Sequence, residues 1–405
     1  MNKKQTWLVI FVIIITLLSL FLRFYNLGFP EKITSDEHYF VNFGRAYVSQ
    51  EFYHDVHPPL GKFFIALGIK IFGDNALGWR FFTALFGSLL VPLGYLLAWK
   101  MFNNKFIAVS FSLFILFDGL FFVQSRLARL DTIYLFFLFL AFYFFFSFLK
   151  SHKDKEIYLI LSGLFLGFSI STKWVALAGG LSFLIIWLIK KKEIKKSIIW
   201  FLFYLVFIPL AIYFLIWQIH YGLISTQPIT FYENFKILTY HQGIKEVHSL
   251  GSPFWSWPLM IYPFSYFIEK SEQVIKYITD LPNPLIWWPA LVGFLYGFFK
   301  FRLKDKKFNI ILIIFASHFL PYLFISRSLF LYHFILAAPF LWLGFLYFLS
   351  KFWYQSKKSK IIILGYFALV IISFVFFYPV LIGQPLSTSS FNLRWWLISW
   401  FPLAV

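Results

Sequence analysis

The chain is dominated by long runs of apolar residues that alternate with short polar segments. Eleven such runs can be marked, and most have the roughly 17–25 residues that a helix needs to cross about 30 Å of hydrocarbon. The pattern therefore predicts an all-α polytopic membrane protein with about eleven transmembrane helices. The runs lie at 7–22, 81–99, 106–123, 132–149, 157–172, 174–189, 197–217, 285–299, 308–325, 329–350 and 361–383.

Two of these predicted spans allow another interpretation. The short runs 157–172 and 174–189 meet at Lys173 and could form one bent segment with a re-entrant piece. We predict two spans, because basic loops flank the pair on the same side. The first run could be a cleaved signal peptide, but no small-x-small site follows it. An uncleaved first span is therefore expected.

Charge supports this topology and suggests an orientation. Every second loop between the predicted spans is short, and these loops together with Lys3 and Lys4 hold 21 of the 36 basic residues. Cytoplasmic loops carry such an excess, so the N-terminus is predicted to be cytoplasmic and the tail after 384 to be outside. The net charge of +19 could instead indicate nucleic-acid binding. Because these charges lie between apolar runs, the topological explanation is preferred, and no nucleic-acid partner is expected.

The amino-acid composition also indicates a membrane protein. Hydrophobic residues make up 60% of the chain and charged residues 13%, more apolar surface than a soluble domain could hide. The chain has no cysteine, which excludes disulfides and cysteine metal sites. We expect three regions: an N-terminal transmembrane catalytic region at 1–217, an outer loop at 218–284 and a C-terminal transmembrane region at 285–405.

The two long outer loops, 24–80 and 218–284, are predicted to be ordered. Apolar residues recur at helical spacing in 39–47 and in 60–72 of the first loop. The second loop is rich in tryptophan and tyrosine, which suit a membrane interface. We therefore expect short helices on the membrane surface in both loops.

Candidate chemistry gathers in the first outer loop. It holds six of the 17 acidic residues, including the adjacent pair Asp36 and Glu37. A surface pair of this kind can be simple solvation, but apolar walls near a membrane perturb carboxylates. A second motif holds Asp55, His57 and Lys62 around Pro58-Pro59. The prolines can fix a rigid corner, or they can merely begin a helix with the polar residues as bystanders.

A third cluster lies at the predicted outer turn near 124–131. Arg126 and Arg129 have the wrong sign for that side, and arginine binds phosphate well. Alternatively, Arg129–Asp131 or Arg126–Asp118 ion pairs only brace the turn. Weaker candidates are Lys173, His241, His248, Arg327, Tyr332 and His333.

No spacing of candidate ligand residues in the sequence requires a bound cofactor. The chain has no His-Glu-x-x-His motif and no glycine-rich phosphate loop. A divalent cation stays open, because Asp36, Glu37 and His57 could hold one. Carboxylates and cations on one membrane face suit a sugar or acyl group carried on a lipid phosphate. The cations would bind the leaving phosphate and a carboxylate would accept the proton of the attacking hydroxyl.

At these residues the chain resembles the protein O-mannosyltransferase family, integral membrane glycosyltransferases of the GT-C type. The resemblance runs from about 7 to 400, and its ordered motifs are fairly specific. They are Ser35-Asp36-Glu37-His38-Tyr39-Phe40, Asp55-Val56-His57-Pro58-Pro59-Leu60-Gly61-Lys62, Gln124-Ser125-Arg126 with Leu130-Asp131, His248-Ser249, Ser256-Trp257-Pro258-Leu259, Asn283-Pro284 with Trp287-Trp288, and Tyr332-His333.

The resemblance implies an inverting transfer of mannose from a polyprenyl-phosphate mannose donor to Ser or Thr of an exported protein. It implies that Asp36 and Glu37 form the catalytic pair, with Asp36 as the base and Glu37 as its partner, and that Arg126 lies near the donor phosphate. His57 and Asp55 would line the same cavity. Lys62, Arg129, Tyr332 and His333 complete the candidates for donor or substrate binding.

The second outer loop is too short for the β-trefoil domain of eukaryotic members, so the chain resembles the bacterial form. We accordingly expect an integral protein of the bacterial inner membrane with its active site on the outer face. Three other functions stay open. They are GT-C transfer of another sugar, such as aminoarabinose, to a lipid or glycan; transport of lipid-linked sugars; and a non-enzymatic scaffold.

Overall fold

The computed structural model describes residues 3–51, 56–151, 155–194, 198–224, 232–243, 248, 251–302 and 304–401. The chain forms two compact units. The first unit comprises Met1–Asn103 and Ser125–Ile244, and the second comprises Asn104–Gln124 and Lys245–Val405. The boundary therefore does not follow the chain order, because 104–124 joins the C-terminal half.

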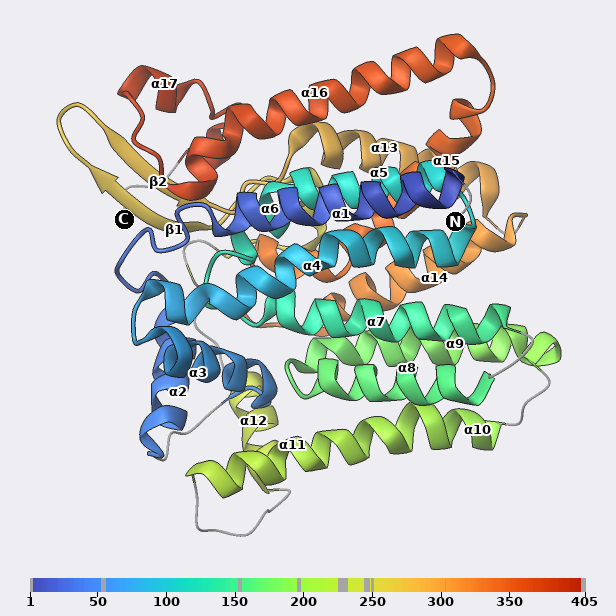
Figure 1. The fold of residues 1–405 in the computed structure, drawn as a ribbon, viewed down its shortest axis with the longest axis horizontal. Helices are drawn as coiled ribbons and strands as arrows, with labels where there is room; N and C mark the ends of the chain where they lie inside the picture. The colour runs from blue at the N-terminus through green and yellow to red at the C-terminus, as the bar shows by residue number, and fades with distance from the viewer. Residues whose placement is uncertain are drawn as a thin grey trace. The chain divides into compact units, whose positions relative to one another are not determined.

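All regular elements in the described part of the first unit are helices. Its helix α1 packs along α4, while α7, α8 and α9 lie side by side (Figure 1). The elements are α1 (Lys3–Phe24), α2 (Glu37–Ser49), α3 (Leu60–Phe72), α4 (Ala76–Phe102), α7 (Asp131–Lys150), α8 (Lys155–Ile170), a 3-10 turn (Trp174–Ala176), α9 (Leu177–Ile194), α10 (Ile198–Leu202), α11 (Ile208–Ile224) and α12 (Tyr232–Gly243).

Two features of this unit follow from local sequence. The 157–172 and 174–189 runs form separate helices, α8 and α9, as predicted. Between α10 and α11, residues Phe203–Phe207 form a π-helical turn. Pro209 follows this turn and lacks the N–H that a regular helix would use, so the wider turn accommodates the ring without ending the span.

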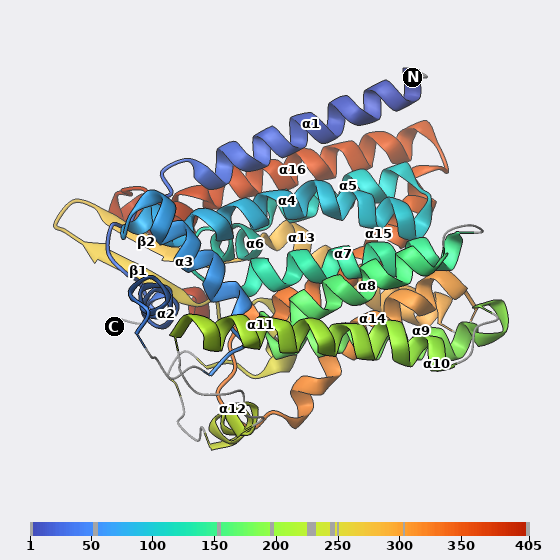
Figure 2. The same cartoon turned by 60° about the horizontal axis from the view of Figure 1, so that its bottom comes forward.

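The predicted first outer loop, 24–80, folds as its periodicity predicts. The run at 60–72 becomes α3, and 39–47 lies within α2. The two helices pack on one another beside the start of α4 (Figure 2). Their shared core contains Phe40, Ile65 and Trp79, all of them buried. This packing fixes the start of α2, where Asp36 and Glu37 lie.

The second unit is also mainly helical. Its elements are α5 (Lys105–Phe117), α6 (Gly119–Gln124), a 3-10 turn (Phe254–Leu259), β1 (Ser265–Lys270), β2 (Ile275–Thr279), α13 (Pro284–Phe301), α14 (Lys306–Phe319), 3-10 turns at Leu320–Phe324 and Leu331–Leu336, α15 (Ala338–Trp353), α16 (Lys357–Ile382), α17 (Thr388–Asn392) and a 3-10 turn (Ile398–Trp400).

The predicted span 106–123 is broken in two. The carboxylate of Asp118 accepts hydrogen bonds from the backbone of Asn283 at 3.2 Å and from the indole of Trp287 at 2.7 Å. A side chain at Gly119 would meet the carbonyl of Leu281 at 1.9 Å. Glycine therefore lets α6 approach this neighbouring loop closely, and Asp118 ties the break to the start of α13.

The second outer loop is where the structure departs most from the sequence prediction. Besides α12, it holds an antiparallel β-hairpin in which Ser265 pairs with Thr279 and Lys270 with Ile275. The strands carry the β-branched and aromatic residues typical of sheets. The expectation of short helices alone, which rests on the tryptophan and tyrosine content of the loop, is thus wrong for 265–279.

The prediction of a mostly helical integral membrane protein is confirmed. Within the described residues, eight helices are long and apolar enough to span a membrane. The count of eleven is not confirmed, because the remaining runs form shorter helices. These are α5, α8 and α15, the last preceded by a 3-10 turn.

Candidate active site

The candidate site begins at a tight turn before α2. Ser35 has a φ of 42°, a left-handed value that is uncommon for residues other than glycine. The backbone N–H of Glu37 donates to the carbonyl of Thr34 at 3.0 Å and closes the turn. Asp36 is the N-cap residue of α2, and a third of its side chain is exposed (33%). Its carboxylate is thus accessible on a fixed backbone.

Glu37, the adjacent carboxylate, has a different environment. It is buried, and Arg80 of α4 pairs with it through Nε–Oε1 at 2.7 Å and Nη2–Oε2 at 2.8 Å. The backbone of Ala128 donates to Oε1 at 2.8 Å, and the hydroxyl of Thr34 donates to Oε2 at 2.8 Å. Both carboxylate oxygens are therefore occupied, and they join α2 to α4 and to the segment before α7.

Burial and the bonded partners of Glu37 shift its pKa in opposite directions. Burial raises the pKa, but the charge of Arg80 and the hydrogen bonds from Arg80, Ala128 and Thr34 together lower it below the ordinary value. Glu37 is thus a charged, fully bonded anchor beside Asp36. Its geometry suits positioning of the turn.

A second ionic chain supports Asp36. Arg129 is 3% exposed, and its Nη1 lies 3.0 Å from Oδ2 of Asp36. The Nε of Arg129 lies 3.6 Å from Oδ2 of Asp131, the first residue of α7. Lys173, in the link between α8 and α9, places its Nζ 2.8 Å from Oδ1 of Asp131. Asp36 therefore lies at the accessible end of a buried chain of alternating charges.

Arg126 lies against the end of α1. Its Nη1 donates to the carbonyls of Arg23 and Tyr25 at 2.7 Å each, and its Nη2 donates to Asn26 at 3.0 Å. A helix leaves its last carbonyls without helical partners, and a cation there is favourable. These contacts give Arg126 a capping role. The predicted contact with a donor phosphate stays a prediction.

The Pro-Pro motif forms the expected corner at the start of α3. The ring of His57 stacks on Phe40 with centroids 6.1 Å apart, and its carbonyl accepts from Nζ of Lys62 at 2.5 Å. Lys62 is fully buried, and burial lowers the pKa of its amine well below the ordinary value. These contacts brace the corner. Asp55, the other candidate of this motif, lies outside the described residues.

Tyr332 and His333 belong to the second unit. Both are buried in the 3-10 turn Leu331–Leu336, where the hydroxyl of Tyr322 donates to the carbonyl of His333 at 3.1 Å. The ring of Trp257 stacks on that of His333 with centroids 6.0 Å apart. Their part in substrate binding stays a prediction.

The acidic and histidine side chains of the described residues can be checked for a divalent-cation site. Within the part of the chain that the structure describes, no group of three or more His, Cys, Asp or Glu side chains could hold a metal ion. Asp36, Glu37 and His57 accordingly form no such group. The reason at Glu37 is that Arg80, Thr34 and Ala128 already occupy its oxygens.

Sequence reasoning missed Arg80 and gave Lys173 little weight. Arg80 precedes the apolar run 81–99, and such a basic residue at the predicted outer end of a span departs from the charge bias of the loops. That departure, which drew attention to Arg126 and Arg129, also holds for Arg80 and Lys173. Only the fold shows which carboxylate each residue meets.

Known proteins match nearly the whole chain. The family described as dolichyl-phosphate-mannose-protein mannosyltransferase matches residues 13–79 and 70–225. The C-terminal four TMM region of protein-O-mannosyltransferase matches residues 229–400. A polyprenol-phosphate-mannose–protein mannosyltransferase of Mycobacterium tuberculosis is 25% identical, covering 99% of this chain and 93% of its own. The corresponding protein of Mycolicibacterium smegmatis is 25% identical, covering 99% and 94%.

Solved structures share the fold. A protein O-mannosyltransferase complex of Saccharomyces cerevisiae, bound to the sugar donor, aligns with a TM-score of 0.87 at 15% identity, covering 99% of this chain and 93% of that one. ArnT from Cupriavidus metallidurans aligns with a TM-score of 0.62 at 17% identity, covering 91% and 64%. Because the sequence matches span nearly all of both halves, the chain belongs to the dolichyl-phosphate-mannose-protein mannosyltransferase family.

Proposed function

We propose that this protein transfers mannose from a polyprenyl-phosphate mannose donor to Ser or Thr hydroxyls of exported proteins, with inversion at the sugar. The observation that carries the proposal is the position of Asp36, an accessible carboxylate at 3.0 Å from the buried guanidinium of Arg129. The family match and the full-length mycobacterial relatives, named as polyprenol-phosphate-mannose–protein mannosyltransferases, support this substrate class.

The reaction is a single displacement. The acceptor hydroxyl oxygen forms a bond to C1 of mannose while the bond from C1 to the phosphate oxygen breaks. Asp36 accepts the proton of the hydroxyl as general base, and polyprenyl phosphate leaves with the bonding electron pair. A phosphate is a good leaving group once its charge is stabilised, so nearby cations do more for this step than a strong general acid would.

Charge around Asp36 suits these roles. Arg129 orients the base, and Lys173 and Asp131 hold Arg129 in turn. Glu37 fixes the turn through Arg80. We assign Glu37 to positioning of the base, a narrower role than the catalytic one expected from the sequence.

The remaining candidate residues keep their predicted roles as part of this proposal. Arg126 would approach the donor phosphate from the end of α1. Within the predicted catalytic region 1–217, His57 and Lys62 would support the wall of the cavity. Tyr332 and His333 would contribute to substrate binding from the C-terminal region, 285–405.

The location of the reaction follows from the donor. A polyprenyl chain confines the donor to the bilayer, so the acceptor has to reach the membrane surface. We place the protein in a bacterial cell membrane with its N-terminus in the cytoplasm and Asp36 on the outer face, because the basic loops then lie inside.

Two other functions make different predictions. A GT-C enzyme for another sugar would use the same base but a different donor. A transporter of lipid-linked sugars would move the donor intact and would favour ionisable residues near mid-membrane in broken helices. The charged network on Asp36 lies instead at the start of α2 and of α7. This placement favours chemistry at the membrane surface.

The test uses the full-length protein purified in detergent, a synthetic polyprenyl-phosphate mannose and a Ser/Thr-containing peptide. Wild type should add one hexose mass to the peptide and release polyprenyl phosphate in equal amount. Asp36→Asn keeps the shape of the side chain and should abolish both products, while the protein still unfolds cooperatively because Asp131 remains beside Arg129. Normal transfer by this variant would refute the assigned base.

Donor analogues separate the alternatives. Transfer from a polyprenyl-phosphate aminoarabinose but not from the mannose donor would show another sugar specificity. Movement of intact donor across vesicle membranes without release of polyprenyl phosphate would show a transporter. Loss of hexose from Ser and Thr of secreted proteins in a deletion strain identifies the acceptor class.

A further inference from the structure

A cavity of about 370 Å³ lies in the second unit, and none of the residues that line it is assigned to the reaction. It is lined by residues of α5, by Trp353 and Tyr354 at the end of α15, and by residues of α16. Its volume falls in the range of small-molecule sites, about 300–1,000 Å³. The proposed glycosyl transfer gives this cavity no role.

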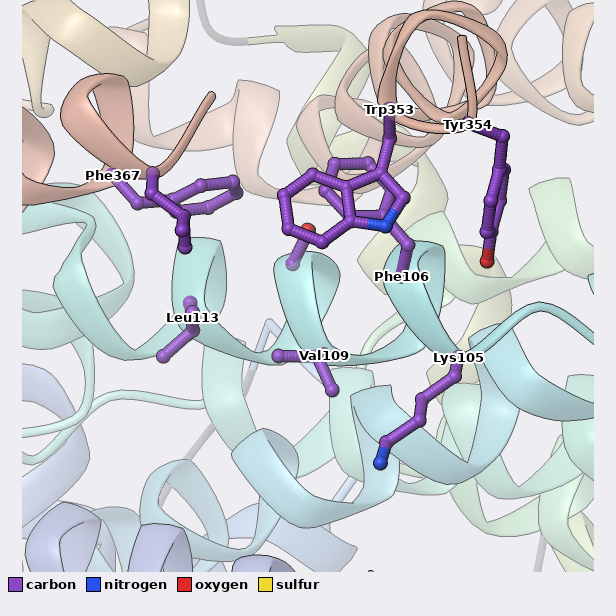
Figure 3. Close-up of a pocket in the computed structure, with 9 residues that line it drawn as sticks. Lys105, Phe106, Val109, Leu113, Trp353, Tyr354 and Phe367 are labelled. Carbon is purple, nitrogen blue, oxygen red and sulfur yellow. The ribbon is translucent and has the colours of Figure 1, made fainter. Parts of the chain in front are cut away.

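The lining separates into two ends (Figure 3). Lys105 and Tyr354 lie at one end, beside Phe106, whereas Leu113 and Phe367 lie at the other. The cavity is therefore amphipathic, with a cation and a phenol at one end and hydrocarbon at the other. That distribution matches a molecule with an anionic head and an apolar tail.

A second cation lies close to the polar end. The amine of Lys360 is 5.9 Å from the ring centroid of Trp353, and that ring stacks on Phe106 with centroids 4.8 Å apart. Lys105 and Lys360 are both exposed. Lys105 lines the same cavity as this aromatic pair, and Lys360 lies beside the pair, so an anion bound at this end would be attracted by both lysines.

The cavity is also placed where lipid is the solvent. α5 is one of the shorter apolar helices, and α16 is long and apolar enough to span the membrane. Leu364 of α16 lines the cavity and is 59% exposed, so the apolar part opens on the surface that bilayer chains cover. Tryptophan and tyrosine, as at 353 and 354, are typical of the interface between chains and headgroups.

We propose that this cavity binds one anionic phospholipid. An acyl chain lies along Val109, Leu113 and Phe367, and the phosphate lies between Lys105 and Lys360. The lysines belong to the basic loops at 100–105 and 351–360, which we expect on the cytoplasmic side, where anionic lipids are abundant. The site would fasten the ends of α5, α15 and α16 to that leaflet.

Native mass spectrometry of the full-length protein tests this directly. Protein in neutral detergent is titrated with phosphatidylglycerol or with phosphatidylcholine carrying the same acyl chains. One phosphatidylglycerol should bind with clear preference. The double variant Lys105→Gln/Lys360→Gln should weaken its binding about thirtyfold, because each lysine near a lipid surface contributes about fivefold. Val109→Trp should fill the cavity and remove binding of both lipids.

Matched variants guard against general effects of charge and bulk. Lys192→Gln/Lys358→Gln removes two exposed lysines that do not line the cavity, and Val375→Trp adds an indole at an exposed position of α16 elsewhere. Both should bind phosphatidylglycerol as wild type does. Equal binding of the two lipids by wild type, unchanged binding by the cavity variants, or a preference for polyprenyl phosphate over phosphatidylglycerol would overturn the proposal.

Discussion

The ion pair between Glu37 and Arg80 makes a sharp prediction about stability. Both side chains are essentially inaccessible, at 1% and 0% exposure, and their atoms approach to 2.7 Å. Glu37→Gln removes the negative charge but keeps the shape, so Arg80 is left buried without a counter-charge. Breaking a buried pair in this way costs about 3–5 kcal/mol. We expect the free energy of unfolding to fall by an amount in that range.

The chain contains a natural control for this experiment. Arg45 of α2 pairs with Asp74 at 2.9 Å, but these side chains are 40% and 47% exposed. Exposed pairs contribute about 0.2–1 kcal/mol because water screens them, so Asp74→Asn should be nearly neutral. Both variants are measured by titrating the full-length protein from mild detergent into SDS. Equal losses for Glu37→Gln and Asp74→Asn would refute the argument from burial.

Two further predictions concern the same site. Arg129→Met should lower kcat for mannose transfer about a hundredfold while KM for the donor changes little, because displacing a catalytic group by about 1 Å has that effect. Arg129→Lys keeps the charge and should restore part of kcat. A change confined to KM would argue against a positioning role for Arg129. Folding lowers the pKa of Glu37 from its ordinary value of 4.5. As the pH falls through this range, the unfolded chain therefore binds a proton before the folded protein does. The contribution of Glu37 to the free energy of unfolding is then lost as the pH falls through the folded pKa. SDS titrations from about pH 7 to 3 should therefore show a falling stability in wild type and a smaller fall in Glu37→Gln, and parallel curves would assign the acid sensitivity to other groups.

The parts of the fold that were predictable are those set by periodicity. Helix α3 was delimited correctly at 60–72, because Pro59 precedes it and Gly73 follows it. The hairpin at 265–279 was not predicted, since a short strand rich in aromatics has the same composition as an interfacial helix. The grouping of α5 and α6 with the C-terminal half was also beyond sequence reasoning, because it depends on contacts between distant segments, such as that of Asp118 with Asn283.

The candidate site shows a similar division. Sequence alone proposed Asp36 from its adjacent acidic pair, and Arg126 and Arg129 from their unexpected sign at an outer turn. The sequence could not show which carboxylate each arginine contacts, because Arg129 and Asp36 are more than ninety residues apart in the chain. The same holds for Arg126, whose contacts with the end of α1 depend on where that helix stops.

The adjacent residues Asp36 and Glu37 show how one turn can separate two roles. Successive residues at the start of a helix project about 100° apart, so one of two neighbouring carboxylates can face the interior while the other stays at the surface. Burial then assigns the roles. Glu37 is enclosed and every oxygen is bonded, so it has no free lone pair well placed to accept a proton. Asp36 keeps a third of its side chain accessible, and its Oδ2 lies 3.0 Å from Nη1 of Arg129. A proton acceptor has to reach its substrate, so of these two carboxylates we propose Asp36 as the base and Glu37 as the residue that holds it in position.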